Sequence, residues 1–408
     1  MSGNCTRKLK MKQFRVLLAI LIAVTAVVAV LFVWVQPSAP PLPPIRALWV
    51  TRFDYDSPED VDRIIRNVGE AGFTDIFFQI RGNGTVYYNS SLEPWAYELS
   101  GNRVQNLGKD PGWDPLQRAI DCAKPYGLRV HAYMNVLPGW KGNTEPPESA
   151  GLLWTAHPDW FMVDSFGERM RPTSGWYAFV NPVVPEVRQH LKGIVKELCA
   201  YDVAGIHLDY IRYPHDYHLV AKQHYPDASQ EELMRRADFS YDSASQSALY
   251  ERYGWDVTKK QIEDFRRDSV TKVVRDLAYV MQVERPGTCI LSASVMGDPV
   301  EGRLHAYQDS GHWIRSGLID WAVQMNYATR SFDRYMKSMR KAAGRKGFRS
   351  SVVVGIYLKH DEERILYQID AVRKSGCRGL ALFSYEFLYG KNHQITEKGR
   401  SVLRAIRP

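Results

Sequence analysis

The sequence predicts an α/β fold, a closed (β/α)8 TIM barrel preceded by a single N-terminal transmembrane helix. Eight short segments rich in β-branched and aromatic residues recur along the chain, and most of them end in polar or charged side chains. Nearly continuous apolar character is typical of parallel strands buried on both faces. Segments with helical spacing separate the strands, and this alternation favours a closed barrel over an open sheet. The polar strand ends are therefore expected to form an active site.

The predicted strands and helices alternate in a constant order. The strands are expected at residues 46–53, 73–81, 128–135, 203–210, 288–296, 319–326, 352–357 and 378–386. The helices are expected at residues 57–71, 113–126, 185–201, 258–283, 309–317, 331–346, 361–375 and 396–406. Ser57 and Pro58 supply a capping hydroxyl and a first-turn proline to the first helix, and Gly72 follows its end. Residues 45–408 suffice for one barrel with long inserts, so we expect a single catalytic domain there.

The residues before the barrel predict a membrane anchor. Residues 1–15 form a basic segment without acids, and residues 16–35 are apolar except for Thr25. About 20 apolar residues span a bilayer core, and the positive-inside rule places the basic end in the cytoplasm. Residues 36–44 form a proline-rich linker. We expect a single-pass protein of the bacterial cell membrane with its barrel on the extracytoplasmic side; cleavage near residues 37–40, which would release it, is the alternative.

Charge and cysteine content exclude some function classes. The formal charge of +8 includes five basic residues ahead of the apolar run, so the barrel itself carries +3. This weak excess does not support a nucleic-acid partner. The cysteines have no zinc or redox spacing, and His215, His218 and His224 follow no metal-binding pattern and are expected to be solvated loop residues. We expect no metal and no other cofactor.

The segment 205–214 (GIHLDYIRYP) is the strongest candidate for catalysis, because it carries a carboxylate at the end of a predicted strand. Alternate residues of a barrel strand point inward, so Asp209 and His207 should share the inner face while Leu208 and Tyr210 share the other. We expect Asp209 to be catalytic and His207, Tyr210 and Arg212 to contact substrate. A neighbouring guanidinium favours the ionised carboxylate, which suits a nucleophile or charge stabiliser better than an acid. The alternative is a buried Asp209 that pairs with Arg212 to fix the loop.

Glu386 is the candidate for a second catalytic carboxylate. It is expected to end the eighth strand, which lies beside the first in a closed barrel. Glycosidic hydrolysis commonly uses two carboxyl groups, about 5 to 5.5 Å apart for retention or 6.5 to 9.5 Å apart for inversion. A solvent-facing Glu386 on the following loop is the alternative.

Other strand ends and loops carry groups suited to sugars. Amide and guanidinium groups form paired hydrogen bonds with hydroxyl and N-acetyl groups. The expected substrate-binding residues of this kind are Arg52, Asp54, Gln79, Arg81, Asn135, Gln324, Asn326 and Tyr357. Inserts after the second and third strands are rich in aromatic residues that can stack on pyranose rings or form a small core of their own, and we expect two or three to reach the cleft. They are Tyr87, Tyr88, Trp95, Tyr97, Trp140, Trp154, Trp160, Trp176 and Tyr177, with Trp140 expected to bind substrate.

Five motifs in order along the chain resemble the bacterial glycosyl hydrolase-like 10 family. They lie at residues 46–52 (RALWVTR), 78–82 (FQIRG), 131–135 (HAYMN), 157–160 (HPDW) and 205–214. The resemblance implies a (β/α)8 hydrolase exported to the cell envelope, with peptidoglycan glycan, stripped or not of its stem peptides, as the substrate class. It carries over Asp209 as catalytic, whereas Glu386 rests on the strand pattern alone.

Two mechanisms and one non-enzymatic function follow from these residues. In the first mechanism Glu386 protonates the leaving oxygen while Asp209 attacks or stabilises the oxocarbenium-like centre; in the second, a substrate N-acetyl group attacks and Asp209 orients it. Neither requires a metal. The alternative function is a catalytically inactive glycan-binding envelope protein, because barrels host many functions. No HExxH or GxSxG motif of a metallopeptidase or serine hydrolase occurs.

Overall fold

The computed structural model describes residues 43–143, 145–148 and 151–407. The predicted basic segment, the transmembrane helix and most of the linker lie outside these residues. Among the residues described, no helix is both long and apolar enough to span a bilayer.

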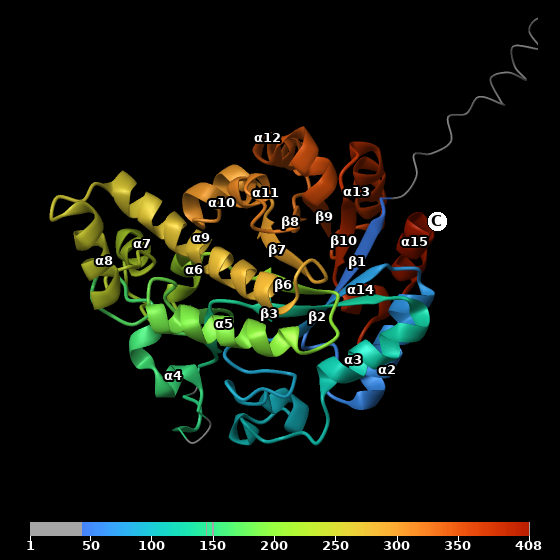
Figure 1. Cartoon of the computed structure of the whole chain (residues 1–408), viewed down its shortest axis with the longest axis horizontal. Helices are drawn as coiled ribbons and strands as arrows, with labels where there is room; N and C mark the ends of the chain where they lie inside the picture. Colours follow the sequence, from blue (N-terminus) through green and yellow to red (C-terminus); the bar gives the residue numbers. More distant parts are fainter. Residues whose placement is uncertain (1–42, 144, 149–150, 408) are drawn as a thin grey trace, which may run out of the picture. The chain divides into compact units, whose positions relative to one another are not determined.

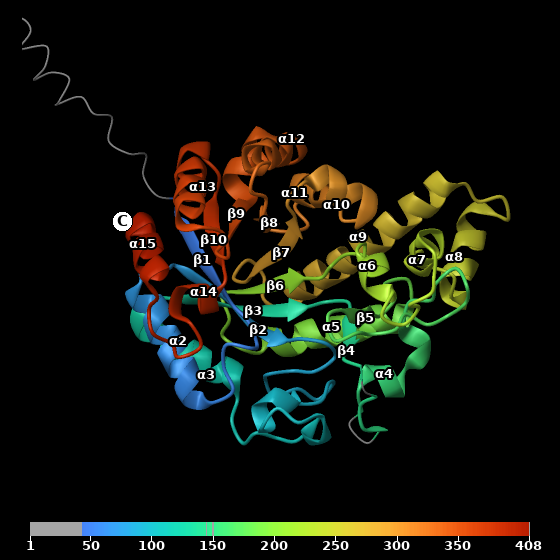
Figure 2. The same ribbon diagram turned by 180° about the vertical axis from the view of Figure 1, so that it is seen from behind.

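Eight parallel strands close into a barrel, which confirms the predicted fold (Figures 1 and 2). In barrel order each strand pairs with its neighbours in sequence, and the first pairs with the last. The strands are β1 (Ile45–Val50), β2 (Asp75–Arg81), β3 (Arg129–Asn135), β6 (Gly205–Asp209), β7 (Ile290–Met296), β8 (Trp321–Met325), β9 (Val352–Tyr357) and β10 (Gly379–Phe383). The eighth strand is shorter than expected, because β10 ends at Phe383 and Glu386 belongs to the helix that follows.

Helices between the strands surround the barrel in Figure 1, and each predicted helix is present. The main ones are α2 (Pro58–Glu70), α3 (Pro115–Ala123), α5 (Pro185–Cys199), α9 (Lys259–Glu284), α11 (Ser310–Arg315), α12 (Phe332–Ser351), α13 (Glu362–Ser375) and α15 (Glu397–Ile406). The Ser57 hydroxyl accepts the Asp60 amide at 3.3 Å, which is the predicted cap of α2. Gly376 ends α13 with φ of +70°, a conformation that glycine adopts without steric cost.

Long inserts follow the carboxyl ends of several strands. After β3, an antiparallel pair joins β4 (Pro138–Lys141) to β5 (Tyr177–Phe179). Short helices complete the inserts: α4 (Leu153–Ala156), α6 (Tyr217–Ala221), α7 (Gln230–Arg236), α8 (Ser243–Tyr253), α10 (Pro299–His305) and α14 (Tyr385–Tyr389). Among the described residues, 3-10 turns lie at Tyr97–Ser100, Val104–Asn106, Lys124–Tyr126 and Pro158–Trp160.

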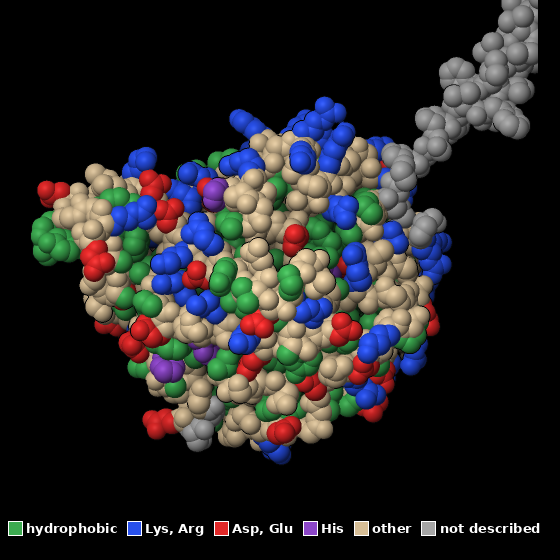
Figure 3. Space-filling model, viewed as in Figure 1, with side chains coloured by type: hydrophobic (Ala, Val, Ile, Leu, Met, Phe, Trp, Pro, Cys, Tyr) green, Lys and Arg blue, Asp and Glu red, His purple; other side chains and the backbone are tan. Residues whose placement is uncertain are grey.

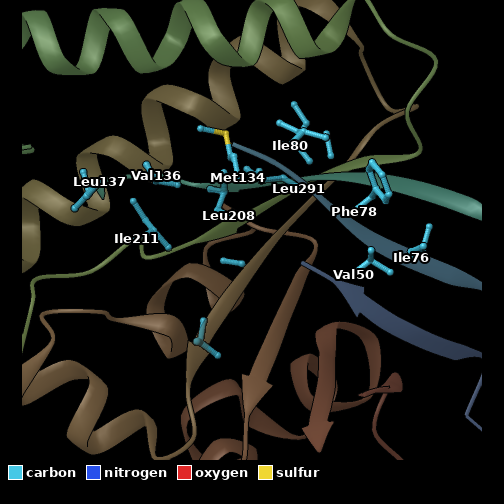
Figure 4. Packing of buried hydrophobic residues seen from close by; sticks show 14 of the residues in the cluster. Val50, Ile76, Phe78, Ile80, Met134, Val136, Leu137, Leu208, Ile211 and Leu291 are labelled. Carbon is cyan, nitrogen blue, oxygen red and sulfur yellow. The ribbon is translucent and has the colours of Figure 1, made fainter. Parts of the chain in front are cut away.

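The hydrophobic core has two layers, because strand side chains alternate between the barrel interior and the helices. Figure 4 shows part of the outer layer, in which alternate residues Ile76, Phe78 and Ile80 of β2 pack beneath the helices with Leu208 of β6. The inner layer is smaller and consists of Ile45, Ala47, Trp49, Phe77, Tyr133, Trp321, Val323, Val353 and Ala381. This inner layer closes the barrel floor, so a ligand has access only to the carboxyl ends of the strands.

Candidate active site

A cavity of about 580 Å³ opens at the carboxyl ends of the barrel strands. This is where barrel enzymes bind substrate, and the volume suits a small sugar unit. Eight predicted site residues line it: Arg52, Gln79, Asn135, Asp209, Tyr210, Arg212, Tyr357 and Glu386. Five others do not: Asp54, Arg81, His207, Gln324 and Asn326. Trp140 lies in a separate cavity described below.

Asp209 lies at the mouth of the barrel with its carboxylate held by three donors. The Tyr133 hydroxyl donates to Oδ2 at 3.0 Å, while the Tyr210 amide and Arg212 Nη1 donate to Oδ1 at 2.7 and 3.2 Å. Burial and the charge of Asp209 raise the pKa of Tyr133 well above its usual range, so this phenol remains a donor. Both oxygens of Asp209 are thus fixed as hydrogen-bond acceptors, an arrangement that suits attack on a cationic centre or its stabilisation.

His207 lies below the cavity, in the barrel interior. Its Nε2 accepts Trp49 Nε1 at 3.0 Å, so the ring proton is on Nδ1, which lies 2.8 Å from the Ser292 hydroxyl. The Ser294 hydroxyl completes the contacts at 2.9 Å. Burial, together with the nearby His131, lowers the pKa of His207 well below its usual range. The inward orientation is as predicted, but the neutral ring supports the floor beneath Asp209 and does not reach a ligand.

Arg52 and two amide side chains form a connected edge of the cavity. The Arg52 backbone amide donates to Gln79 Oε1 at 3.0 Å, and Gln79 Nε2 donates to Asn135 Oδ1 at 3.3 Å. The guanidinium donates to the Tyr177 hydroxyl at 3.3 Å and lies 3.7 Å from Glu98. These contacts link the ends of β1, β2 and β3 and present guanidinium and amide groups to the cavity.

Arg81 does not contact the cavity, although it was expected to bind substrate. Its side chain is fully buried and forms a paired interaction with Glu93, Nε to Oε2 at 2.7 Å and Nη2 to Oε1 at 2.6 Å. It also donates to the Val136 carbonyl at 3.1 Å. Burial opposes ionisation of Glu93, yet the charge of Arg81 and the hydrogen bond from His190 lower the pKa of Glu93 to about 2. Arg81 therefore secures the end of β3 beneath the site.

Gln324 and Asn326 also serve the scaffold. Gln324 Nε2 donates to the Gly297 carbonyl at 2.7 Å, and Asn326 Nδ2 donates to the Phe332 carbonyl at 2.9 Å. Both side chains are fully buried and hold the loops after β7 and β8. Of the residues predicted on strands β8 and β9, only Tyr357 reaches the cavity.

Glu386 and Asp54 form a second carboxyl cluster. Glu386 is exposed on the first turn of α14 and lines both the central cavity and a neighbouring one of about 750 Å³. Asp54 lines only the neighbouring cavity, and its Oδ2 accepts the Thr51 amide and hydroxyl at 2.6 and 2.9 Å. Burial, with the charge of Glu386 adding to it, raises the pKa of Asp54 to about 6. Asp54 can therefore carry a proton at mildly acidic pH, which a general acid requires.

Two aromatic residues of the inserts, Trp176 and Tyr177, line the central cavity, within the number expected. Tyr97 lines the neighbouring cavity. Trp140 and Trp154 line a third cavity of about 450 Å³, away from the strand ends. Trp140 and Trp154 are almost fully buried, so the aromatic surfaces open to a sugar ring are those at the barrel mouth.

Tyr210 departs from the predicted alternation. β6 ends at Asp209, and Tyr210 has φ of +50°, which turns the chain away from the strand. Leu208 packs in the outer core as expected, but the Tyr210 ring enters the cavity wall, with its centroid 5.1 Å from that of Tyr177 and 6.3 Å from that of Trp176. A left-handed backbone at a bulky residue is uncommon and is often found at functional sites.

Lys141 lines the cavity, but the sequence pattern did not identify it as a site residue. It ends β4, partly buried, with its ammonium 5.3 Å from the Tyr177 ring centroid and 6.0 Å from that of Phe53. Within the described residues it has no acidic partner inside 4.0 Å. Only the pairing of β4 with β5, which no local pattern indicated, brings Lys141 to the barrel mouth.

Tyr133 and His215 are further cavity residues that the sequence did not identify as site residues. Tyr133 lies two positions before Asn135 on β3, so strand alternation would have identified it as inward-facing. His215 is also a wall residue, partly buried and 2.9 Å from Asp216, and the expectation of a solvated loop histidine is wrong. Among the described residues no cluster of three or more His, Cys, Asp or Glu side chains could hold a metal ion.

The sequence profile of the glycosyl hydrolase-like 10 family matches residues 44–370. The chain belongs to this family. The match covers the barrel from β1 to most of α13 and so includes Asp209, Lys141 and Asp54, while Glu386 lies beyond it.

Curated relatives agree with this membership. The glycosyl hydrolase YngK of Bacillus subtilis is 26% identical over 317 residues, which cover 71% of this chain and 55% of that protein. The glycosyl hydrolase DigH of Escherichia coli K12 is 24% identical over 341 residues, covering 72% of this chain and 68% of that protein. The chain therefore spans about half the length of YngK and two thirds of DigH.

Solved structures support the fold alone. The catalytic domain of β-amylase from Paenibacillus polymyxa has a TM-score of 0.62 at 11% identity, covering 89% of this chain and 99% of that one. The PgaB (BpsB) glycoside hydrolase domain of Bordetella bronchiseptica has a TM-score of 0.52 at 14% identity, covering 90% and 99%.

Proposed function

We propose that this chain is a membrane-anchored glycoside hydrolase that cleaves a bacterial envelope polysaccharide, with peptidoglycan glycan strands as substrate. The observation that carries the hydrolase assignment is the position of Asp209. Its carboxyl group lies at the carboxyl end of a barrel strand, is fixed by three donors and faces a cavity that Glu386 also lines. Membership of the glycosyl hydrolase-like 10 family supports the same chemistry.

The two carboxyl groups take separate roles in the proposed mechanism. Asp209 attacks the anomeric carbon or stabilises the positive charge that develops there, or it orients a substrate N-acetyl group that attacks. Glu386, exposed on α14 and open to the cavity, protonates the leaving oxygen. Asp54 lies beside Glu386 and retains its proton up to about pH 6. Below this pH Asp54 therefore adds no negative charge next to Glu386.

Cationic groups in the cavity support an anionic glycan as substrate. Lys141 and Arg52 both lie close to the rings of Phe53 and Tyr177. A glycan strand without stem peptides exposes the lactyl carboxylate of each muramic acid residue, whereas a stem peptide converts that carboxylate into a neutral amide. Lys141, the lining cation that no acid pairs within the described residues, therefore favours denuded strands.

The apolar run at residues 16–35 supports the membrane assignment, with the barrel on the extracytoplasmic side. Cleavage within the linker would instead secrete the barrel.

The decisive experiment is mass spectrometry of soluble products after incubation with peptidoglycan, untreated or freed of stem peptides by an amidase. Wild-type protein should release short sugar fragments, in larger amount from the amidase-treated polymer. Asp209→Asn should release none, because the amide lacks the charge that both mechanisms need. An active Asp209→Asn variant would contradict both mechanisms.

The second candidate function, a glycan-binding protein without catalysis, is favoured by aromatic residues in three separate cavities. Retention of the wild-type protein on the wall without any released fragment would support it.

A further inference from the structure

Helix α12 carries a concentrated positive charge that the proposed hydrolysis does not use. Its residues Phe332–Ser351 include a single acid, Asp333, and seven basic side chains, all of which are exposed. The basic residues are Arg334, Lys337, Arg340, Lys341, Arg345, Lys346 and Arg349. Figure 3 shows Lys and Arg side chains gathered over this helix.

The rest of the barrel does not share this positive charge. Residues 43–408 carry a formal charge of +3, because the five basic residues of the first 15 account for the rest of the +8. Helix α12 alone carries +6, so the remainder of the barrel is slightly acidic. The excess positive charge of the domain therefore lies on one helix.

The basic side chains of α12 are not neutralised by the surrounding structure. Within the described residues none of the seven forms a salt bridge. Arg334 donates to Ser331 at 3.2 Å, and Arg340 packs over Phe348 and donates to the Ser375 carbonyl. The single acid of α12, Asp333, accepts a hydrogen bond from the Tyr367 hydroxyl of α13 at 2.6 Å. Such a surface attracts an anionic partner.

The position of α12 indicates which partner. α12 is kinked at Gly344, which has φ of +74°, and the part after the kink leads into β9 at Val352. The strand register places Val353 beside Gly379, which pairs with Ile45 of β1. The last turns of α12 thus lie toward the end of the barrel where the chain enters from the linker. Figures 1 and 2 both place α12, α13 and the start of β1 along one edge.

The linker is too short to take this end of the barrel far from an anchor. Residues 36–44 reach at most about 30 Å when fully extended. If residues 16–35 span the membrane, the linker keeps the start of β1 within about 30 Å of the bilayer surface. Tethering over this distance raises the effective concentration of lipid headgroups at the basic surface.

We propose that α12 is a docking surface for the anionic phospholipid headgroups of the membrane that anchors the chain. The interaction is electrostatic, because each basic residue at an anionic surface contributes about fivefold to partitioning. It should weaken as salt shortens the screening length below its physiological value of about 8 Å.

Lysine footprinting of the full chain in vesicles tests this proposal. A water-soluble acylating reagent is applied to protein in phosphatidylcholine vesicles with and without phosphatidylglycerol, and modification is measured for each lysine by mass spectrometry. Lys337, Lys341 and Lys346 should be protected only in the anionic vesicles, and high salt should abolish the protection. Lys259 and Lys272, exposed on α9, are the internal controls.

A matched pair of variants separates docking from general charge. Arg345→Gln with Arg349→Gln should lower the ratio of docked to free barrel by about 25-fold, which follows from two losses of about fivefold. Arg66→Gln with Arg275→Gln removes the same charge from exposed positions on α2 and α9 and should leave the protection unchanged.

Three outcomes would overturn the proposal. Equal labelling in both lipids shows that α12 does not meet the membrane, and equal protection in both shows that charge does not drive the contact. Protection that requires added anionic wall polymer, with none from lipid, assigns the surface to the wall. Release of soluble glycan fragments does not depend on membrane docking. The mass-spectrometric assay therefore tests the proposed hydrolysis separately from this proposal.

Discussion

Replacing Asp54 by Asn should stabilise the protein at neutral pH, because this carboxyl group ionises in an unfavourable place. Burial and the adjacent Glu386 raise the pKa of Asp54 from 3.8 to about 6. Each pKa unit corresponds to about 1.4 kcal/mol, so ionised Asp54 lowers the free energy of unfolding by about 3 kcal/mol at pH 7. Asparagine cannot ionise and keeps an oxygen that can accept the Thr51 amide and hydroxyl.

The pH dependence of this effect has a definite sign. Below pH 3.8 Asp54 is protonated in the folded and unfolded states and makes no difference. Between about pH 4 and pH 6 the folded chain retains a proton that the unfolded chain has lost, so stability falls as the pH rises. Above pH 6 the loss is complete. The advantage of Asp54→Asn should therefore be absent near pH 3.5 and full at pH 7.5.

Thermal unfolding of both proteins across this pH range measures the effect. For a domain of this size, about 3 kcal/mol corresponds to a rise in Tm of about 4 °C at pH 7.5. Asp227→Asn, at an exposed loop position, is the control and should leave Tm unchanged at every pH. A Tm difference for Asp54→Asn that is zero, negative or constant with pH would refute the assignment of a raised pKa to this group.

Three further variants test other parts of the site. Glu93→Gln should destabilise the fold by about 3 to 5 kcal/mol in urea unfolding, because it leaves the Arg81 guanidinium buried without a counter-charge; an unchanged midpoint would contradict the ion pair. Tyr133→Phe should lower kcat about 10- to 100-fold with KM little changed, because one donor to Asp209 is lost, and a change confined to KM would place Tyr133 in substrate binding instead. Lys141→Gln should raise KM about tenfold for glycan freed of stem peptides and leave KM for a neutral N-acetylglucosamine polymer unchanged; equal effects on both would remove Lys141 from carboxylate recognition.

Local patterns in the sequence were sufficient for the barrel and for its principal carboxylate. Apolar runs, helix caps and glycines after helices depend on residues a few positions apart, and they predicted all eight strands. Strand alternation also predicted that Asp209 and His207 point inward, because side-chain direction within a strand has a period of two.

The tertiary structure decided which polar strand ends face a ligand. Arg81 and Gln79 look equivalent at the end of one strand, yet Arg81 is neutralised by Glu93 from the following insert while Gln79 lines the cavity. Lys141 reaches the cavity only through the pairing of two insert strands, β4 and β5. Glu386 reaches it from helix α14, although the sequence pattern predicted that the eighth strand would extend to this residue.

The sequence by itself thus determined the (β/α)8 fold, the family and the position of Asp209, because each depends on short-range periodicity or on contiguous motifs. The raised pKa of Asp54, the neutral His207 beneath the site and the cationic wall at Lys141 were decided by the tertiary structure. Each of these properties is set by burial and by charges or hydrogen-bonding groups contributed from distant segments, and no local pattern encodes which of those segments will meet.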